Sequence, residues 1–200
     1  AAGGTAAFFK ADVTKSAEVK AMVDEAVRLY GRLDVVVNNA GWTHRNRPML
    51  EVSEDEFDKV YAINMKSIYL SAIHAVPALR QAGGGSIINV ASINGVSPGA
   101  FQGVYSMTKA AVINMTKVFA KECAGFGIRC NALLPGLTDT KFASALVKND
   151  AILKMALAQI PLKRVADPSE MAGAVLYLVS PVASYTTGTC MPVDGGYLLV

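Results

Sequence analysis

A tyrosine, a lysine and a serine are spaced in this sequence as an acid–base site would need them. Tyr105 and Lys109 are four residues apart, so on a helix they lie on the same face. Ser92 precedes Tyr105 by 13 residues, at the expected end of a strand. A phenol titrates near ~10, and a neighbouring ammonium favours its phenolate form. Together the three residues predict proton transfer to or from an alcohol oxygen.

Each of these residues also has an ordinary explanation. A tyrosine and a lysine at this spacing occur in many helices, where the tyrosine packs and the lysine is solvated. Ser92 could cap the turn that follows it, as could Asn94 or Ser97. The three residues therefore need the support of further motifs before they indicate an enzyme.

Composition argues for a globular protein without a nucleic-acid or membrane partner. Of 200 residues, 52% are hydrophobic and 18% are charged, which is enough for a sizeable core. The 19 basic and 16 acidic residues give a net charge of +3 and form no basic run. No apolar stretch reaches the ~18 residues of a membrane span, and no signal peptide opens the sequence. We expect a soluble, cytoplasmic protein.

The cysteines and histidines do not form a metal-site pattern. Cys123, Cys130 and Cys190 lack metal-ligand spacing, and His44 and His74 are 30 residues apart. We expect reduced, mostly buried thiols, as in a cytosolic protein, and no bound metal.

Short apolar strands alternate with amphipathic helices, which is typical of a parallel sheet covered on both faces. The pattern predicts a single α/β domain over residues 1–200. The predicted strands are 6–10, 33–37, 86–91, 128–133 and 190–193. The predicted helices are 16–30, a long helix from 53 past 69, 105–123, 151–160 and 168–179. The strand 33–37 is continuously apolar, as expected when both of its faces are buried.

Residues typical of helix ends support these bounds. Ser53 and Glu56 form a capping-box pattern at the start of the long helix, and Pro77 is expected to limit or kink its far end. Asp167 and Pro168 form an N-cap and N1 pair. The first helix has Ser16 as its predicted cap and Gly31 as its predicted stop.

Further motifs occur in a fixed order along almost the whole chain. They are Asp12-Val13, Asn38-Asn39-Ala40-Gly41, Asn64, Pro135-Gly136-Leu137-Thr138-Asp139-Thr140 and Val193-Asp194-Gly195-Gly196. With Ser92, Tyr105 and Lys109 among them, they resemble the short-chain dehydrogenase/reductase family, and in particular its β-ketoacyl-carrier-protein reductases. The resemblance implies a Rossmann-like, doubly wound parallel sheet. Any one motif is weak evidence, but their common order leaves little room for coincidence.

The resemblance implies reversible hydride transfer between NAD(P)H and a ketone or secondary alcohol. Tyr105 would be the general acid and base, and Ser92 would donate a hydrogen bond to the reacting oxygen. Lys109 would keep the phenol pKa low and bind the nicotinamide ribose. Asn64 would hold a water that links Lys109 to solvent.

The same resemblance assigns cofactor contacts to the carboxyl ends of the strands, where ligands bind in such sheets. Asp12 and Val13 would contact the adenine ring, segment 38–41 would shape the cofactor crevice, and segment 135–140 would lie beside the nicotinamide. The predicted cofactor-binding residues are Asp12, Val13, Asn39, Ala40, Gly41, Tyr105, Lys109, Pro135, Gly136, Thr138 and Thr140.

Several of these positions keep a structural alternative. The adjacent asparagines of the second motif could form a plain turn, and Asp12 could be an ordinary loop residue. Asn64 could bond a neighbouring carbonyl of its own helix. Thr138 and Thr140 could simply tie their loop.

The first substrate candidate is a 3-oxoacyl thioester, possibly carrier-bound, because the most similar branch reduces those. Alternatives are a sugar or polyol dehydrogenase of the same family and a non-catalytic member of the fold. Arg45 and Arg47 lean slightly towards an anionic substrate. The loop they share with Trp42 and His44 could equally be a solvated loop anchored by one aromatic residue. NAD and NADP remain equally possible, since the segments that choose between them do not occur in this sequence.

Two further expectations concern a lid and a partner subunit. Segment 140–161 is apolar without strand signals, and the resemblance implies a substrate lid there; a surface helix pair is the alternative. The helices beginning at Ser53 and near Gly103 have apolar residues on more than one face, which fits burial against another subunit. The resemblance implies a homotetramer.

The sequence departs from the family at its start. No glycine-rich phosphate loop occurs, although open α/β sheets of this kind carry one after the first strand. Gly83-Gly84-Gly85 precedes a strand and is predicted to be a turn. We therefore expect the sequence to be incomplete, with an opening strand, a glycine loop, a helix and a second strand before Ala1. The missing loop is the one feature that favours the non-catalytic alternative.

Overall fold

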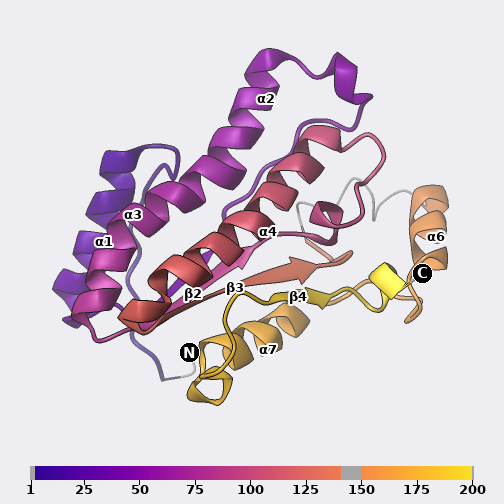
Figure 1. Ribbon diagram of the computed structural model, residues 1–200. Coiled ribbons are helices and arrows are strands. Elements are labelled where there is room, and N and C mark those ends of the chain that lie inside the picture. Colours follow the sequence, from indigo (N-terminus) through magenta and orange to yellow (C-terminus); the bar gives the residue numbers. More distant parts are fainter. Residues whose placement is uncertain (1–2, 141–149, 200) are drawn as a thin grey trace.

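The computed structural model describes residues 3–140 and 150–199 (Figure 1), and within them four parallel strands form one sheet in chain order. The strands are β1 (Val35–Asn38), β2 (Gly85–Val90), β3 (Ile128–Pro135) and β4 (Cys190–Val193). The α-helices are α1 (Ser16–Tyr30), α2 (Glu54–Tyr61), α3 (Ser67–Gln81), α4 (Gly103–Cys123), α6 (Asp150–Ala158) and α7 (Pro168–Val179). The predicted α/β class with a parallel sheet is confirmed. None of the described helices has the length and hydropathy to span a membrane.

Helices cover both faces of the sheet, because successive strand residues point to opposite sides. Figure 1 shows α1, α3 and α4 on one side of the sheet and α7 on the other. Ile87 packs with Leu79 of α3 on the first side. Its neighbour Ile88 packs with Leu133 and with Leu178 of α7 on the second side. The two layers of apolar side chains fix the register of the central strands.

Two strand predictions are corrected. Residues 6–10 form no strand, and Phe8 is 89% exposed. A strand needs a partner for its backbone groups, and the described strands pair only with one another. Val35 and Val37 of β1 are 36% and 44% exposed, so this strand is not buried on both faces. The reason is that α7 packs mainly against β2, β3 and β4.

Several predicted helix ends are confirmed. Gly31 ends α1 in the left-handed conformation with φ 77°. Ser53 caps α2 by accepting a hydrogen bond from a backbone N–H of the first turn. Asp167 caps α7 in a complete capping box. These local signals act over three or four residues, so they can be recognised without knowledge of the fold.

One helix-end prediction is wrong, and another is only partly tested. Ser16 is the first residue of α1 and not its cap, and its hydroxyl lies 2.9 Å from Nε2 of His74 in α3. Pro77 lies inside α3 and does not stop it directly, because the helix continues to Gln81; the kink stays a prediction. The turns that follow Pro77 are held by Leu79, which is fully buried in the core.

The long helix predicted from residue 53 past residue 69 is divided. A π-helix (Ala62–Lys66) separates α2 from α3. Such a segment accommodates more residues per turn than an α-helix and is often found at functional sites. Asn64 lies at its centre and is fully buried.

The parallel strands bring their carboxyl ends to one side of the sheet, which we call the carboxyl edge. Segment 39–41 follows β1, Ser92 follows β2 and segment 136–140 follows β3. The carboxyl edge therefore gathers most of the residues to which the sequence assigned chemistry.

Candidate active site

Ser92, Tyr105 and Lys109 converge at the carboxyl edge. Tyr105 and Lys109 lie one helical turn apart near the start of α4, and none of the three residues is more than 9% exposed. The side chains of Ser92 and Tyr105 are hydrogen-bonded to each other. The Lys109 Nζ atom lies 5.6 Å from the centroid of the Tyr105 ring. The structure thus brings together the three residues that the sequence spacing linked.

Ser92 both caps a turn and contacts Tyr105, two roles that were alternatives when only the sequence was considered. Its Oγ accepts a 3.1 Å hydrogen bond from the Asn94 backbone, which caps the 3₁₀ turn Ile93–Gly95, and its hydroxyl also contacts Tyr105. Gly95 ends that turn directly against α4. A Cβ atom on Gly95 would lie 2.7 Å from the carbonyl carbon of Lys109, so a glycine here permits the close approach of the turn to the helix.

Burial shifts the pKa values of both ionisable groups. Burial raises the pKa of Tyr105, and the hydrogen bond from Ser92 opposes that shift. Burial lowers the pKa of Lys109 to about 8. The Lys109 ammonium donates a 2.7 Å hydrogen bond to the Val90 carbonyl. Removal of the phenol from water is the larger influence on the pKa of Tyr105, and the predicted lowering of that pKa by Lys109 stays a prediction.

Asn64 joins the loop after β1 to α4. Its amide makes two hydrogen bonds to the backbone of Trp42, accepting from the N–H at 2.8 Å and donating to the carbonyl at 2.9 Å. It also donates to the Thr108 hydroxyl at 3.1 Å, and that hydroxyl donates to the Tyr105 carbonyl at 2.8 Å. Bonding to a carbonyl of its own helix is therefore not the role of this side chain. Thr108 lies between Tyr105 and Lys109 in the sequence and carries no signal of its own there, so only its hydrogen-bond partners reveal its part in the site.

The first asparagine of the motif after β1 is not a plain turn residue. Asn38 is the last residue of β1, and its amide donates a 2.8 Å hydrogen bond to Asn89 on the neighbouring strand. Asn89 is fully buried and donates in turn to Thr116 of α4 at 2.9 Å. This buried polar chain fixes the end of β1 relative to β2 and α4.

Gly41 lies beside the lysine ammonium. Asn39 and Ala40 connect it to β1, and a Cβ atom on Gly41 would lie 3.8 Å from both Asn64 Oδ1 and Lys109 Nζ. A side chain at this position would fill the space next to the ammonium. The glycine leaves a cradle there, which fits a polar cofactor group that approaches Lys109.

The predicted nicotinamide segment is held at its start. The Gly136 N–H donates a 2.9 Å hydrogen bond to the last residue of β4, and a Cβ atom on Gly136 would lie 2.6 Å from the Cα atom of Asp194. Thr138 Oγ1 donates to the Gly136 carbonyl at 3.1 Å, and Thr140 Oγ1 donates to the Thr138 carbonyl at 3.5 Å. Pro135, the last residue of β3, precedes them. Both threonines therefore tie their own loop in this structure.

The structure does not bring Asp12 and Val13 to the catalytic cluster. The Asp12 carboxylate accepts hydrogen bonds from the Thr14 backbone at 3.0 Å and from its hydroxyl at 2.7 Å. These bonds hold the pKa of Asp12 below its usual value. The Asp12 N–H donates to Glu18 of α1 at 2.7 Å. Asp12 therefore makes the contacts expected of an ordinary loop residue.

The loop after Gly41 is anchored by more than one aromatic residue. The Trp42 ring lies 4.3 Å from the Lys59 ammonium, and the Arg47 guanidinium forms a 3.1 Å ion pair with Glu56. His44 is 1% exposed, and its Nδ1 lies 2.8 Å from the Arg45 carbonyl. Burial of His44 was not predicted, because its neighbours in the sequence are polar.

The predicted lid is described only in part. Residues 141–149 of segment 140–161 lie outside the described residues. Helix α6 is described, and Ile160 beyond it is 3% exposed. A Cβ atom on Gly195 would lie 2.8 Å from the Ile160 side chain, so the end of the segment packs on the glycines that follow β4.

Comparison with known proteins identifies the family. The family model described as enoyl-(acyl carrier protein) reductase matches residues 1–198. The chain is 47% identical to 4-formylbenzenesulfonate dehydrogenase TsaC1/TsaC2 of Comamonas testosteroni, over 96% of this chain and 78% of that protein. The chain belongs to the short-chain dehydrogenase/reductase family. This dehydrogenase/reductase is also 38% identical to 3-oxoacyl-(acyl-carrier-protein) reductase FabG of Thermotoga maritima, over 94% of the chain and 75% of the relative.

Solved structures agree with this family. A short-chain type dehydrogenase/reductase from Mycobacterium ulcerans matches with a TM-score of 0.96 at 28% identity, covering 100% of this chain and 72% of that one. A gluconate 5-dehydrogenase from Burkholderia cenocepacia, solved with NADP and tartrate, matches with a TM-score of 0.91 at 30% identity, covering 94% and 74%. The predicted Rossmann-like fold is confirmed. The predicted enzyme class is confirmed as well: this dehydrogenase/reductase is an NAD(P)-dependent oxidoreductase that acts on CH–OH donors.

Proposed function

We propose that Tyr105 is the general acid and base of a reversible hydride transfer between a nicotinamide cofactor and a ketone or secondary alcohol. The observation that carries the proposal is the buried hydrogen bond between Ser92 and Tyr105, at the carboxyl edge where Gly41 and Lys109 meet. The nicotinamide, when bound, supplies or accepts the hydride.

The protein's own part is to move a proton and to stabilise charge. In reduction, Tyr105 donates its proton to the substrate oxygen as negative charge develops there. Burial raises the pKa of the phenol, so the proton is present at neutral pH. Ser92 donates a hydrogen bond to the same oxygen and orients it. In oxidation the phenol must first lose its proton, which favours alkaline conditions.

Lys109 is proposed to hold the cofactor ribose. One of its three N–H donors is used on the Val90 carbonyl, and the cradle at Gly41 leaves room for a hydroxyl group beside the ammonium. The further residues proposed for the cofactor site are Asp12, Val13, Asn39, Ala40, Pro135, Gly136, Thr138 and Thr140. Either NAD or NADP satisfies this assignment.

Asn64 is proposed as the fourth catalytic residue, through a water that reprotonates Tyr105 by way of Lys109. The support is its burial at the centre of the π-helix, with its Oδ1 near the same Gly41 cradle as the ammonium. Its amide is engaged by Trp42 and Thr108, so the side chain also fixes the loop that borders the cradle. The water relay stays a prediction.

We infer a small-molecule substrate. The relative of 47% identity is named as a dehydrogenase of 4-formylbenzenesulfonate, whereas the reductase named for a 3-oxoacyl group on acyl carrier protein is 38% identical. Arg47, one of the two arginines that favoured an anionic substrate, is paired with Glu56 and therefore does not choose between an aromatic sulfonate and a carrier-bound group. The order of identity makes a small aromatic carbonyl compound the first candidate. The carrier-bound 3-oxoacyl thioester is the second candidate, and a sugar or polyol is the third.

A substrate panel tests this function. The purified protein is assayed with NAD and NADP, in both directions, on an aromatic aldehyde, a cyclic diol, gluconate and a 3-oxoacyl thioester, with Tyr105→Phe as the matched variant. The phenylalanine variant should lose roughly 10²- to 10⁴-fold in kcat, because the proton donor is gone. The loss in kcat should far exceed any change in the dissociation constant of the reduced nicotinamide, since Tyr105 is only one of several predicted cofactor contacts.

Two outcomes would contradict the proposal. Equal turnover by the parent and Tyr105→Phe would exclude the tyrosine as acid and base. Absence of turnover on every substrate, with cofactor binding retained, would favour the non-catalytic alternative.

We propose that residues 1–200 form one cofactor-binding domain and that segment 140–161 acts as its substrate lid. The packing of Ile160 on Gly195, close to the start of the 136–140 segment, supports a lid attached beside the site.

We also propose a homotetramer in the cytoplasm. Exposed apolar side chains lie on the sides of α2, α3 and α4 that face away from the sheet. They are Phe57, Tyr61, Tyr69, Ile73, Met107 and Val118. The three cysteines are free thiols, which suits a reducing compartment.

A further inference from the structure

A short segment before α7 pairs with the backbone of the proposed nicotinamide segment. Ala166 donates a 3.0 Å hydrogen bond to the Leu137 carbonyl and accepts a 2.9 Å hydrogen bond from the Asp139 N–H. Thr138 lies between these two bonds as the bridge partner of Ala166 and is 8% exposed. The position of Thr138 therefore depends on where Ala166 is held.

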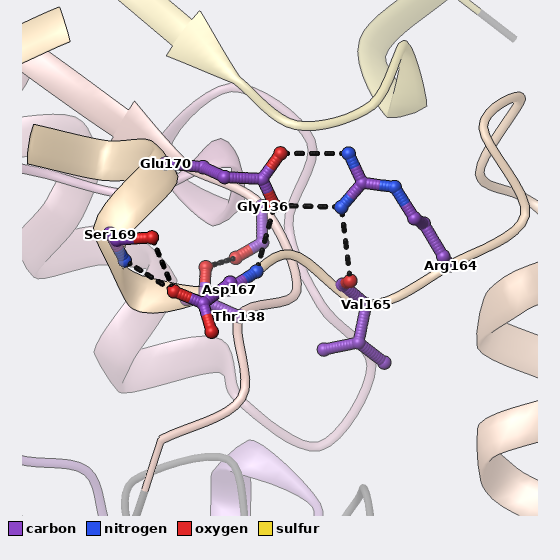
Figure 2. A network of polar contacts seen from close by, with 7 residues as sticks. All are labelled: Gly136, Thr138, Arg164, Val165, Asp167, Ser169 and Glu170. Atoms are coloured by element: carbon purple, nitrogen blue, oxygen red, sulfur yellow. Dashed lines mark hydrogen bonds and ion pairs between the residues drawn. The ribbon is translucent and has the colours of Figure 1, made fainter. Parts of the chain in front are cut away.

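Glu170 holds both ends of segment 164–167, as Figure 2 shows. Its carboxylate accepts two 2.7 Å hydrogen bonds from the Arg164 guanidinium, in the bidentate arrangement that a planar fork allows. The same carboxylate accepts a 2.8 Å hydrogen bond from the Asp167 N–H. Glu170 belongs to the first turn of α7, which packs on the sheet. One carboxylate therefore fixes Ala166 from both sides.

The other flank of the 136–140 segment is fixed by the sheet itself. Gly136 donates a hydrogen bond to Val193 of β4 and packs against Asp194 so closely that a Cβ atom would lie 2.6 Å from its Cα atom. The segment is thus held between β4 and Ala166. The contact with β4 is made by backbone groups of the sheet. The contact with Ala166 depends on the exposed side chains of Arg164 and Glu170.

The Arg164–Glu170 pair is suited to local geometry more than to global stability. The two side chains are 54% and 38% exposed, and exposed ion pairs contribute little to the free energy of unfolding. Arg164 is the main cause that lowers the pKa of Glu170 to about 2. The Glu170 carboxylate therefore stays ionised at every physiological pH. Its hydrogen bonds to Arg164 and to the Asp167 N–H stay formed as well.

We propose that Arg164 and Glu170 are positioning residues that hold Thr138 and its neighbours in the geometry needed to bind the nicotinamide. The pair acts through Ala166 and has no contact of its own with the reacting groups among the described residues. This inference rests on the proposed function, because that function assigns the 136–140 segment to the cofactor.

The first test measures hydrogen exchange resolved to single amides, without any ligand. Arg164→Gln breaks the ion pair and leaves Glu170 able to bond the Asp167 N–H. The matched control is Arg28→Gln on α1, where Arg28 and Glu25 form another exposed bidentate pair, with two 2.7 Å hydrogen bonds from Nε and Nη2. Exchange of the Asp139 and Ala166 amides should become roughly three- to tenfold faster in Arg164→Gln only.

The second test measures the dissociation constants of NADH and NADPH by fluorescence titration without substrate. Arg164→Gln and Glu170→Gln should bind the preferred cofactor roughly three- to tenfold more weakly, and Arg164→Lys should lie between them and the parent. At saturating cofactor kcat should be retained, so the loss appears in the KM for the cofactor. Arg28→Gln should match the parent.

The outcomes separate this inference from the proposed function. Unchanged exchange in Arg164→Gln, or unchanged cofactor affinity in a parent that binds, would overturn the positioning role. An equal effect in Arg28→Gln would overturn it too, since the effect would then be general. A parent that binds neither cofactor would contradict the proposed function, and the assignment of these residues to nicotinamide binding would fall with it even if the amides exchanged faster.

Discussion

At the scale of single residues, burial governs how Tyr105 and Lys109 respond to pH. Both side chains are nearly inaccessible, and burial pushes each towards its neutral form: it raises the pKa of the phenol and lowers that of the ammonium. Ser92 is the neighbour that opposes this trend for the tyrosine. The acid–base behaviour of the site should therefore depend strongly on the serine.

Ser92→Ala should move the alkaline limb of the pH–rate profile. The hydrogen bond from Ser92 lowers the pKa of Tyr105, so its loss should raise that pKa further. The midpoint at which alcohol oxidation rises with pH should shift upward, and kcat should fall by roughly 10²- to 10³-fold because a donor to the reacting oxygen is removed. The measurement is kcat/KM for oxidation against pH in both proteins. A midpoint that shifts downward would contradict the assigned direction.

Lys109→Met should change how stability depends on pH. The pKa of Lys109 is about 8 in the folded protein and 10.5 in its ordinary state, so the unfolded chain binds more protons between these values. Stability of the parent should therefore rise with pH in this window, whereas the variant lacks this contribution. From about pH 7 to about pH 9.5 the parent should gain about 2 kcal/mol relative to the variant. Urea unfolding at both pH values measures the difference, and a parallel response of the two proteins would contradict a depressed pKa.

The spacing of Tyr105 and Lys109 on one helix face could be predicted, because helical periodicity is a local property. The partner of the ammonium could not. Val90 lies 19 residues before Lys109, and its carbonyl is available only because β2 ends beside α4. Sequence reasoning placed the lysine correctly on its helix and missed the desolvation that controls its charge.

At the scale of elements, the contact between the Ile93–Gly95 turn and α4 sets the geometry of the cluster. Ser92 opens this turn and Lys109 lies in the helix, so the distance between the two elements fixes the distance between their side chains. The turn approaches the helix so closely that Gly95 meets the Lys109 backbone.

Gly95→Ala should separate the two elements. Its Cβ atom would lie 2.7 Å from the Lys109 carbonyl carbon, so the backbone must shift, at a cost of about 1 to 3 kcal/mol in the free energy of unfolding. Because the reacting groups are displaced as well, kcat should fall by roughly tenfold or more. Gly173→Ala on α7 is the control, since nothing lies within 4 Å of its Cβ position. A Gly95→Ala protein with parental stability and kcat would show that the close approach of Gly95 to Lys109 does not set the geometry of the site.

Elements with local signals were predicted well, and those that depend on distant partners were not. The α7 capping box lies within four residues, and its bounds follow from Asp167 and Pro168. Residues 6–10 have strand-like composition, but a strand exists only where another backbone pairs with it. The π-helix was not predicted, and the hydrogen bonds of Asn64 at its centre join it to Trp42 and Thr108, which are 22 and 44 residues away in the sequence.

At the scale of the whole molecule, two helical surfaces remain apolar on the side away from the sheet. On α3, Tyr69 and Ile73 are 52% and 45% exposed and one turn apart. On α4, Met107 and Val118 are 47% and 42% exposed. Surfaces of this kind are usually covered by another protein surface, which is the basis of the proposed homotetramer.

Charged substitutions on these helices should dissociate the assembly. The variant Ile73→Lys with Met107→Lys places two ammonium groups in the proposed interface, where they would be buried without partners. Light scattering after size exclusion should show a tetrameric mass for the parent and a smaller species for the variant. Leu50→Lys is the control, since Leu50 is 99% exposed and lies outside these helices. A parent of monomeric mass would contradict the proposal.

The convergence of distant segments is what the sequence could not reveal at this scale. The pairing of Thr138 with Ala166, and the packing of Gly136 on Asp194, join segments that are 28 and 58 residues apart. Periodicity and capping rules operate over a few residues and contain no information about such pairs. The family motifs include segments 135–140 and 193–196, but Ala166 lies outside every motif, so its part in positioning Thr138 was not predicted.

The π-helix Ala62–Lys66 has a consequence for the history of this chain. A π turn holds about one residue more than an α turn, so loss of one residue here would let α2 and α3 join as one regular helix while both keep nearly the same faces towards the core. The change would fall on the π segment itself, where Asn64 would lose the position from which its amide meets the backbone of Trp42. The length of this stretch should therefore be inherited unchanged together with Asn64, whereas its less buried positions can diverge.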